Sequence, residues 1–91
     1  MATYTYKVYS KSNCAYCVKA KDLLDQEFMP YEVIGCDGVD RSSFLEEMKR
    51  KIGRPYTTFP MIFRIEQETG EETFVGGFRE LFYWFESFES E

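Results

Sequence analysis

The chain has 91 residues and a net charge of −5, with 30% of its residues charged and 44% hydrophobic. This length suits a single domain over residues 1–91, and the apolar fraction is enough for one hydrophobic core. The acidic balance argues against general nucleic-acid binding, because the nearest basic cluster, residues 49–51, is better placed to complement the end of a helix dipole than to bind phosphate.

Membrane insertion and secretion are also disfavoured. No apolar run approaches the roughly 18 residues that a membrane span needs. The first residues lack the basic start and apolar stretch of a secretory signal, so we expect a cytoplasmic protein. In a reducing compartment, its three cysteines are more often catalytic or metal-binding than structural. The absence of histidine excludes histidine-based acid–base catalysis and histidine-containing zinc sites.

The first half of the chain is predicted to form a strand, a helix and a second strand. Residues 3–10 are rich in β-branched and aromatic side chains, which favour a strand. Ser12 and Asn13 offer N-cap side chains to a helix over residues 14–27. A short strand follows over residues 31–34. The helix is predicted from the spacing of its apolar residues Cys17, Ala20 and Leu24.

The middle of the chain is predicted to form a second helix. The sequence Ser43-x-x-Glu46 matches a capping box, which opens a helix at its N-terminus. The helix is expected to run to about Ile52. Gly53 is a natural stop, because glycine readily adopts the left-handed conformation that follows many helices.

The last third of the chain is predicted to form a β-hairpin and a closing helix. Strands over residues 61–65 and 73–75 flank a glycine-containing turn over residues 68–71. The pair Gly76-Gly77 then breaks the strand pattern. Residues 78–88 carry apolar side chains at helical spacing, up to and including Phe88.

The predicted order is therefore β-α-β-α-β-β-α, which places the chain in the α/β class. The first βαβ unit makes its two strands parallel with a right-handed crossover. The second half adds an antiparallel hairpin. A single four-stranded mixed sheet with helices on both faces is the simplest compact arrangement of these elements.

Cys14-Ala15-Tyr16-Cys17 is a CxxC motif at the start of the first predicted helix. Residues three apart lie on the same side of a helix, so the two sulfurs can meet in a disulfide. Cys14 faces unpaired backbone N–H groups and the positive end of the helix dipole, which favour its thiolate, and Lys11 adds positive charge. Cys17 shares the apolar face of the helix and is expected to stay a thiol. The motif therefore predicts that Cys14 attacks a disulfide and that Cys17 resolves the mixed disulfide.

Two other interpretations of the motif stay open, namely half of a zinc site and a pair of incidental cysteines. A structural zinc site takes four ligands, usually as two close pairs, and Cys36 is the one further cysteine in the sequence. The strand–CxxC–helix context favours redox chemistry over both. Cys36 itself follows the second predicted strand and is most simply a packing or neutral surface residue, with a regulatory thiol as the alternative.

Thr58-Phe59-Pro60 is a second signal, directly before a predicted strand. A cis peptide bond before Pro60 would leave the backbone N–H and C=O of Phe59 open to pair with an extended peptide. A trans proline at a strand start fits the local sequence equally well.

Taken in order, these motifs resemble those of the glutaredoxin family within the thioredoxin fold. The ordered combination is specific, whereas CxxC alone is moderate support. The resemblance covers essentially the whole chain and is carried by Lys11-x-x-Cys14-Ala15-Tyr16-Cys17, Thr58-Phe59-Pro60 and Gly76-Gly77.

The resemblance implies glutathione as co-substrate and no resident metal. It places Tyr16 beside the bound thiol, Lys11 at the glycine carboxylate, and the backbone of Phe59 along the cysteinyl part. The residues after Gly76-Gly77 take the γ-glutamyl end at a helix N-terminus, a suitable place for a carboxylate. The implied glutathione-binding residues are Lys11, Tyr16, Thr58, Phe59, Pro60, Gly76, Gly77, Phe78, Arg79 and Glu80.

The resemblance therefore implies a monomeric, glutathione-dependent oxidoreductase that reduces protein disulfides and glutathione mixed disulfides. One alternative is an NrdH-like electron donor to ribonucleotide reductase, reduced by thioredoxin reductase; Lys11 and Tyr16 favour the glutathione-dependent branch. A second alternative is a 2Fe–2S cluster held between two subunits by Cys14 and glutathione, since Ala15 stands where the family motif usually has proline. Arg79 is unusual at its position in the family.

Overall fold

The computed structural model describes residues 4–89, and side chains from residue 4 to residue 86. Thr3, expected in the first strand, and the side chain of Phe88 lie outside this description. The elements in chain order are β1 (Tyr4–Ser10), α1 (Ala15–Gln26), β2 (Tyr31–Gly35), α2 (Arg41–Ile52), β3 (Met61–Glu66), β4 (Glu72–Gly76) and α3 (Phe78–Glu89).

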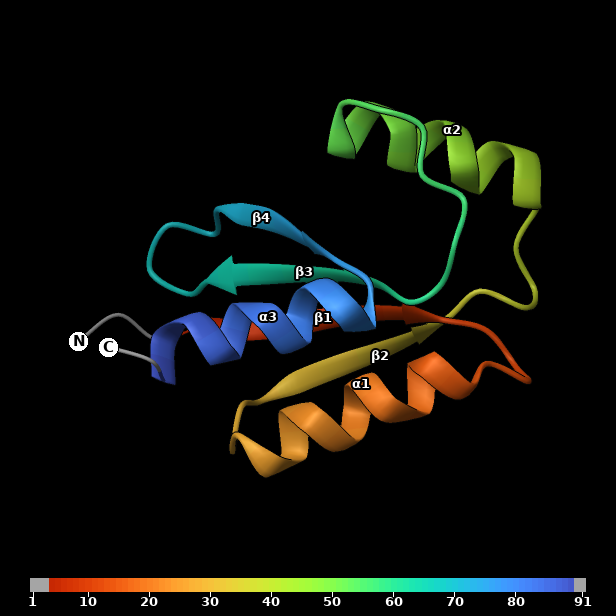
Figure 1. Cartoon of the computed structure of the whole chain (residues 1–91). Helices are drawn as coiled ribbons and strands as arrows, with labels where there is room; N and C mark the ends of the chain where they lie inside the picture. The colour runs from red at the N-terminus through yellow and green to blue at the C-terminus, as the bar shows by residue number, and fades with distance from the viewer. Residues whose placement is uncertain (1–3, 90–91) are drawn as a thin grey trace.

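The strands form one mixed sheet in the order β2-β1-β3-β4, as Figure 1 shows. Strands β1 and β2 are parallel, with Val8 opposite Val33. Strand β3 runs antiparallel to both of its neighbours, β1 and β4. The predicted βαβ unit and hairpin are thereby confirmed. Strand β1 ends just before the CxxC motif, and its antiparallel neighbour β3 begins just after Thr58-Phe59-Pro60.

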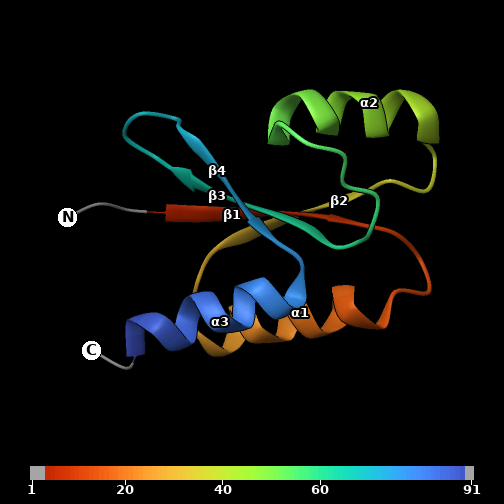
Figure 2. The same ribbon diagram turned by 45° about the horizontal axis from the view of Figure 1, so that its top comes forward.

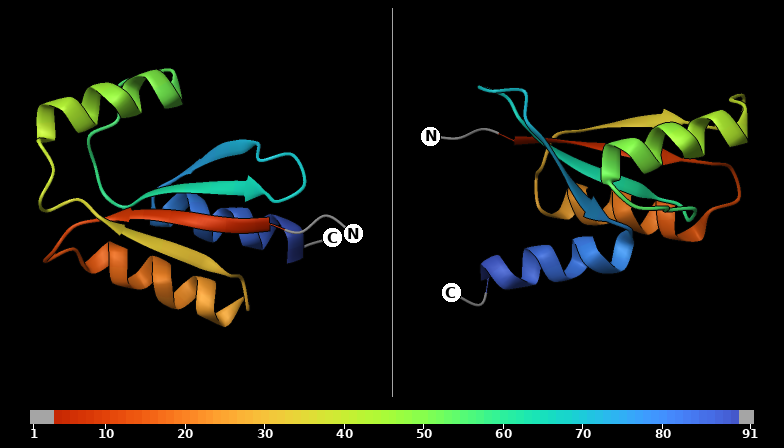
Figure 3. Two further views of the ribbon diagram at one scale, coloured as in Figure 1. Left: turned by 180° about the vertical axis from the view of Figure 1, so that it is seen from behind. Right: turned by 90° about the horizontal axis from the view of Figure 1, so that it is seen from above.

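Helices cover both faces of the sheet, as predicted. Helices α1 and α3 lie side by side on one face, and α2 lies alone on the other (Figures 2 and 3). The face under α1 and α3 carries the larger core, because each of the two helices contributes fully buried side chains to it. This core consists of Tyr6, Val8, Ala20, Leu24, Ile62, Leu81 and Phe85.

The core under α2 is smaller. Met48 is the buried residue that α2 contributes, and it meets Tyr9, Met61 and Phe63 from the sheet. Half-buried aromatic and aliphatic side chains fill the margin of this core. They include Ile34, Cys36, Phe44, Leu45, Ile52, Tyr56, Phe59 and Phe74.

The predicted N-cap of the first helix is wrong. Cys14 is the N-cap residue of α1, and its sulfur accepts a hydrogen bond from the backbone N–H of Cys17. Ser12 instead donates hydrogen bonds from its N–H and its hydroxyl to Asp37, 25 residues along the chain. Asn13 adopts a left-handed conformation with φ of 56°, which turns the chain between the strand and the helix.

The predicted start of the second helix is also wrong, by three residues, because the capping box places the N-cap at Ser43 and the structure places it at Asp40. Helix α2 begins at Arg41, with Asp40 as its N-cap residue, so Ser43 lies inside the first turn. The Ser43 hydroxyl donates to the Asp40 carboxylate at 2.7 Å rather than capping a backbone N–H group. The predicted stop is confirmed, because Gly53 is left-handed with φ of 91° and its N–H donates to the carbonyl of Lys49.

Across residues 4–89, every helix is too short or too polar to cross a membrane.

Candidate active site

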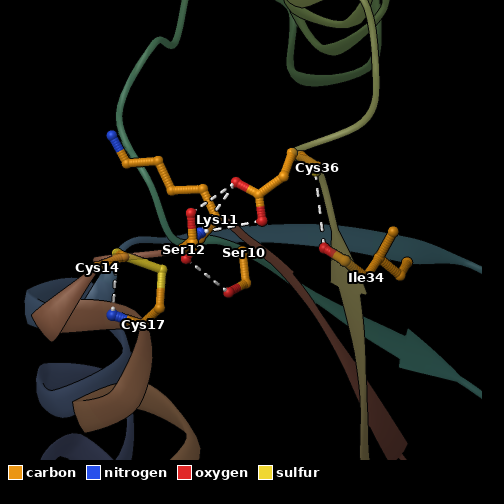
Figure 4. The surroundings of a disulfide bond; sticks show 8 residues. Ser10, Lys11, Ser12, Cys14, Cys17, Ile34 and Cys36 are labelled. Carbon is orange, nitrogen blue, oxygen red and sulfur yellow. Dashed lines mark hydrogen bonds between the residues drawn. A yellow bond between two sulfur atoms is a disulfide. The ribbon is translucent and has the colours of Figure 1, made fainter.

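The two cysteines of the CxxC motif meet at the N-terminus of α1. The structure joins Cys14 and Cys17 in a disulfide, with their Cα atoms 5.2 Å apart (Figure 4). Cys17 is 1% exposed and belongs to the buried side of α1, whereas Cys14 is partly exposed. Only the outer sulfur is therefore open to a large substrate.

The start of α1 provides a donor to the outer sulfur. The backbone N–H of Cys17 points at Cys14 Sγ with an N···S distance of 3.2 Å. When the disulfide is reduced, this donor and the positive end of the helix dipole both favour the thiolate over the thiol. The geometry supplies what a nucleophilic cysteine needs without any neighbouring base.

The second motif, Thr58-Phe59-Pro60, directly precedes the central strand β3. The Phe59–Pro60 peptide bond is cis, which decides between the two conformations that the sequence left open. Pro60 is buried, Phe59 is half-buried and Thr58 is exposed. The ring of Phe59 stacks on Phe44 of α2, with ring centres 5.9 Å apart.

The Gly76-Gly77 pair packs against this proline segment. A Cβ atom on Gly77 would lie 3.5 Å from the carbonyl oxygen of Pro60 and 3.3 Å from the Tyr56 hydroxyl. Gly76 has φ of 127°, and a Cβ atom there would lie 2.7 Å from the side chain of Glu80. Gly76 therefore needs glycine for its positive φ, whereas a side chain at Gly77 would make a tight contact with the Tyr56 hydroxyl.

Glu80 caps its own helix. Its carboxylate accepts a hydrogen bond from the N–H of Gly77, with an N···O distance of 2.8 Å. The N–H of Leu81 donates to the Gly77 carbonyl, so Gly77 is the residue that precedes the first turn of α3. Arg79 is exposed on that turn.

Aromatic rings link the starts of the two neighbouring helices. Tyr16 of α1 is 58% exposed and stacks on Phe78 of α3, with ring centres 6.1 Å apart. The Lys19 amine lies 5.1 Å from the centre of the Tyr16 ring. Tyr16 and Phe78 thus form one aromatic pair across the starts of α1 and α3.

A cavity of about 170 Å³ opens on the α2 side of the site. Its two cationic residues are Lys11 and Arg41, and its walls are partly apolar. The Lys11 amine lies 5.7 Å from the centre of the Phe59 ring. The lining residues are Lys11, Cys36, Asp37, Val39, Arg41, Phe44 and Phe59, and we call this space the Lys11–Arg41 cavity.

Sequence reasoning missed Asp37, Arg41 and Phe44 as neighbours of the site. The segment around Asp37 has the composition of a turn, and Arg41 and Phe44 lie on a helix whose own pattern gives no functional signal. Nothing local in the sequence indicates that these residues approach Lys11, because the contact depends on how α2 packs over the sheet.

The side chain of Cys36 packs against the protein and is only partly exposed to solvent. It is half-buried beside the smaller core, and its Sγ lies 3.6 Å from the carbonyl oxygen of Ile34, to which it donates (Figure 4). Burial raises the pKa of the Cys36 thiol, and the charge of Asp37 raises it too, which outweighs the lowering effect of a hydrogen bond from the Ser10 backbone. Cys36 therefore ionises less readily than an ordinary cysteine.

No group of three or more Cys, Asp or Glu side chains gathers as a metal site within residues 4–89.

Comparison with known sequences agrees with this chemistry. The sequence model of the Glutaredoxin family matches residues 7–68. Glutaredoxin 1 of Escherichia coli K12 is 30% identical over 84 residues, which are 85% of this chain and 87% of that protein. Glutaredoxin 3 of the same strain is 36% identical over 64 residues, or 70% of this chain and 72% of that protein.

Comparison with solved structures gives the same result for the fold. The crystal structure of glutaredoxin 1 from Francisella tularensis in complex with cacodylate superposes with a TM-score of 0.76. The two sequences are 27% identical, and the match covers 98% of this chain and 100% of the other. The mixed sheet with helices on both faces is thus a thioredoxin-like fold.

Proposed function

Because the chain belongs to the glutaredoxin family of thiol–disulfide oxidoreductases, we propose that it uses glutathione to reduce glutathione mixed disulfides and protein disulfides. One observation carries the proposal: a partly exposed Cys14 at the N-terminus of α1, hydrogen-bonded to a backbone N–H and paired with a buried Cys17. This arrangement separates an attacking thiolate from a sheltered partner.

With a glutathione mixed disulfide, Cys14 acts alone. Its thiolate attacks the glutathionyl sulfur, a bond forms between Cys14 and glutathione, and the substrate leaves as a thiolate that takes a proton from solvent. A glutathione thiolate then attacks the glutathionyl sulfur bound to Cys14. Glutathione disulfide is released and Cys14 is again a thiolate, so one glutathione thiol has been consumed for each substrate thiol formed.

With a protein disulfide, both cysteines act. Cys14 attacks one sulfur of the substrate and the other sulfur leaves as a thiolate. Cys17 then loses its proton and attacks the sulfur of Cys14, which frees the second substrate thiolate and leaves the Cys14–Cys17 disulfide. Two molecules of glutathione reduce this disulfide and depart as glutathione disulfide.

Glutathione is proposed to bind across the three segments that meet at Cys14. Its glycine carboxylate pairs with Lys11, with Arg41 as a second cation in the same cavity. Its cysteinyl backbone pairs with Phe59 in the Thr58–Pro60 segment. Its γ-glutamyl end lies at the start of α3, where Phe78 also stacks on Tyr16.

The protein is proposed to work as a monomer with one domain over residues 1–91, in the cytoplasm, where a glutathione pool can serve it. Disulfide-bearing proteins are its macromolecular substrates, and ribonucleotide reductase is one such protein to test.

The electron source provides the test. The wild type would be assayed on a small glutathione mixed disulfide, once with glutathione, glutathione reductase and NADPH, and once with thioredoxin reductase and NADPH. We expect turnover with glutathione only, and a loss of at least about 10³-fold in Cys14→Ser, because a serine hydroxyl does not ionise at neutral pH. Turnover with thioredoxin reductase only would refute glutathione dependence, and an active Cys14→Ser variant would refute the assigned nucleophile.

A further inference from the structure

The loop that precedes Cys14 is hydrogen-bonded to the loop after β2, which is distant in sequence, through the carboxylate of Asp37. The backbone N–H of Ser12 lies 3.0 and 3.2 Å from the two carboxylate oxygens of Asp37, and the Ser12 hydroxyl lies 3.1 Å from one of them. Figure 4 shows Ser12 with these hydrogen bonds, next to Lys11 and the disulfide. Ser12 thus directs both of its donors at one side chain.

A backbone hydrogen bond supports the same junction. The N–H of Cys36, the neighbour of Asp37, donates to the carbonyl of Ser10 with an N···O distance of 2.8 Å. The two loops are therefore joined on both sides of Lys11, at Ser10 and at Ser12. The three hydrogen bonds to the Asp37 carboxylate are exposed to solvent, but a carboxylate is a stronger acceptor than a neutral oxygen.

The junction also shapes the Lys11–Arg41 cavity. Lys11 comes from the first loop, Asp37 from the second, and Arg41 from the first turn of α2 directly after it. The backbone after Lys11 turns at once through the left-handed Asn13, so it has no regular structure of its own to hold it. The Ser12–Asp37 hydrogen bonds take the place of such structure.

We propose that Asp37 is a positioning residue that acts through Ser12 to place Lys11 for the anionic end of glutathione. This role rests on the proposed function and adds to it a residue that contacts neither the reacting sulfurs nor, in this account, the substrate. Cys14 does not depend on the junction, because its sulfur is held by the Cys17 N–H within α1. Loss of Asp37 consequently weakens glutathione binding and spares the thiolate.

The test separates binding from thiolate reactivity. In Asp37→Ala we expect the KM for a glutathione mixed disulfide to rise about fivefold with kcat within about twofold of wild type. Asp37→Asn keeps one acceptor oxygen and should lie between the two. The pH profile of Cys14 alkylation by neutral iodoacetamide should not move in either variant.

A second reagent reads the position of Lys11 without glutathione. Anionic iodoacetate is favoured over iodoacetamide by a nearby positive charge. Asp37→Ala and Asp37→Asn lose the same negative charge, but only asparagine keeps an acceptor for Ser12, so the ratio of the two rates at Cys14 should be about twofold lower in Asp37→Ala than in Asp37→Asn. The ratio can be measured even if the wild type fails to turn over glutathione substrates. That failure would refute the proposed function, and the ratio alone would then test whether Asp37 positions Lys11.

Asp40→Ala is the matched control. Asp40 also accepts a hydrogen bond from a serine on the surface, but from Ser43, three residues away on the same element. We expect its KM and reagent ratio to equal those of the wild type. The proposal is overturned if Asp37→Ala leaves both quantities unchanged, or if Asp40→Ala changes them equally. It is also overturned if the pH profile of Cys14 alkylation shifts as much as KM does. Tighter glutathione binding by Asp37→Asn than by the wild type would overturn it too, because it would show that the Asp37 charge repels glutathione.

Discussion

The two faces of the sheet carry hydrophobic cores of different size. We call the face under α1 and α3, with the larger core, the deep face, and the face under α2, with the smaller core, the shallow face. On one face, α1 buries Cys17, Ala20 and Leu24 and packs beside α3. On the other face, α2 buries Met48 and otherwise rests on half-buried side chains. The redox cysteines belong to the deep face, whereas Lys11, Phe59 and the Lys11–Arg41 cavity belong to the shallow one.

This difference suits the two tasks that we propose for the site. Disulfide exchange needs two sulfurs at a fixed separation at the end of a rigid helix, which a well-packed face supplies. Binding of a flexible tripeptide tolerates adjustment of the walls around it, which a thinner face allows. The comparison predicts that damage to the deep face lowers stability, and that damage to the shallow face lowers affinity.

The largest expected effect is on the deep face. Leu24 is 0% exposed in the larger core, so Leu24→Ala should lower the free energy of unfolding by about 3 kcal/mol. Urea unfolding measures the loss. At temperatures where the variant stays folded, its KM for a glutathione mixed disulfide should match that of the wild type. A raised KM would contradict the expectation that changes on the deep face affect stability and not affinity.

The matched change on the shallow face is Met48→Ala. We expect a smaller loss of stability, about 2 kcal/mol, because the half-buried rim can close around the shortened side chain. The KM should rise, because Phe44 and Phe59 both pack against the core that contains Met48. Urea unfolding and steady-state kinetics measure the two effects, and a variant with wild-type KM would contradict the link between this core and the binding site.

The free and the redox-active thiols should also differ in reactivity. Burial raises the pKa of Cys36, so more of it stays protonated at neutral pH than of an ordinary cysteine. In the reduced protein at pH 7, Cys14 should react with iodoacetamide at least about ten times faster than Cys36. Mass spectrometry of each peptide measures the rates, and Cys36→Ser should leave the Cys14 rate unchanged. Comparable rates at the two positions would argue against the thiolate-stabilising role of the helix terminus.

The smallest expected effect concerns the ion pair between Glu72 of β4 and Lys51 of α2. Glu72 lies 2.9 Å from the Lys51 amine and 3.7 Å from the Lys7 amine. Burial is the largest single influence on the pKa of Lys51 and acts to lower it, but the hydrogen bonds and charges of Glu72 and Tyr9 together outweigh burial and raise the pKa. These side chains are about one third exposed, so Glu72→Gln should cost no more than about 0.5 kcal/mol at neutral pH.

The pH dependence of this pair has a definite sign. A base whose pKa is raised by folding stabilises the fold while it is protonated, and that contribution is lost as the pH rises through the ordinary value of 10.5 and beyond. The stability difference between wild type and Glu72→Gln should therefore shrink above that pH. A difference that grows instead would mean that the ion pair is not its cause.

The sequence predicted the fold well because its elements carry strong local signals. The strand pattern before the CxxC motif, the stop at Gly53 and the turn before Gly76 each follow from the chemistry of nearby residues. The order of elements then left one simple sheet arrangement, which the structure confirms.

The errors arose where distant contacts decide. Ser12 has the composition of an N-cap residue, but Asp37, 25 residues later, takes its hydrogen bonds and leaves the cap to Cys14. Asp40 in turn captures the hydroxyl of Ser43, which looked like a cap within its own segment. The Lys11–Arg41 cavity was invisible for the same reason, because α2 must first pack over the sheet to bring Arg41 near Lys11.

The most direct test of the central claim compares wild type with Cys17→Ser on two substrates, a small glutathione mixed disulfide and an intramolecular protein disulfide, with glutathione, glutathione reductase and NADPH. We expect the variant to keep at least about half of the wild-type activity on the mixed disulfide and to lose nearly all activity on the protein disulfide, because only the second reaction needs a resolving thiol. Equal loss on both substrates would contradict the division of roles between Cys14 and Cys17.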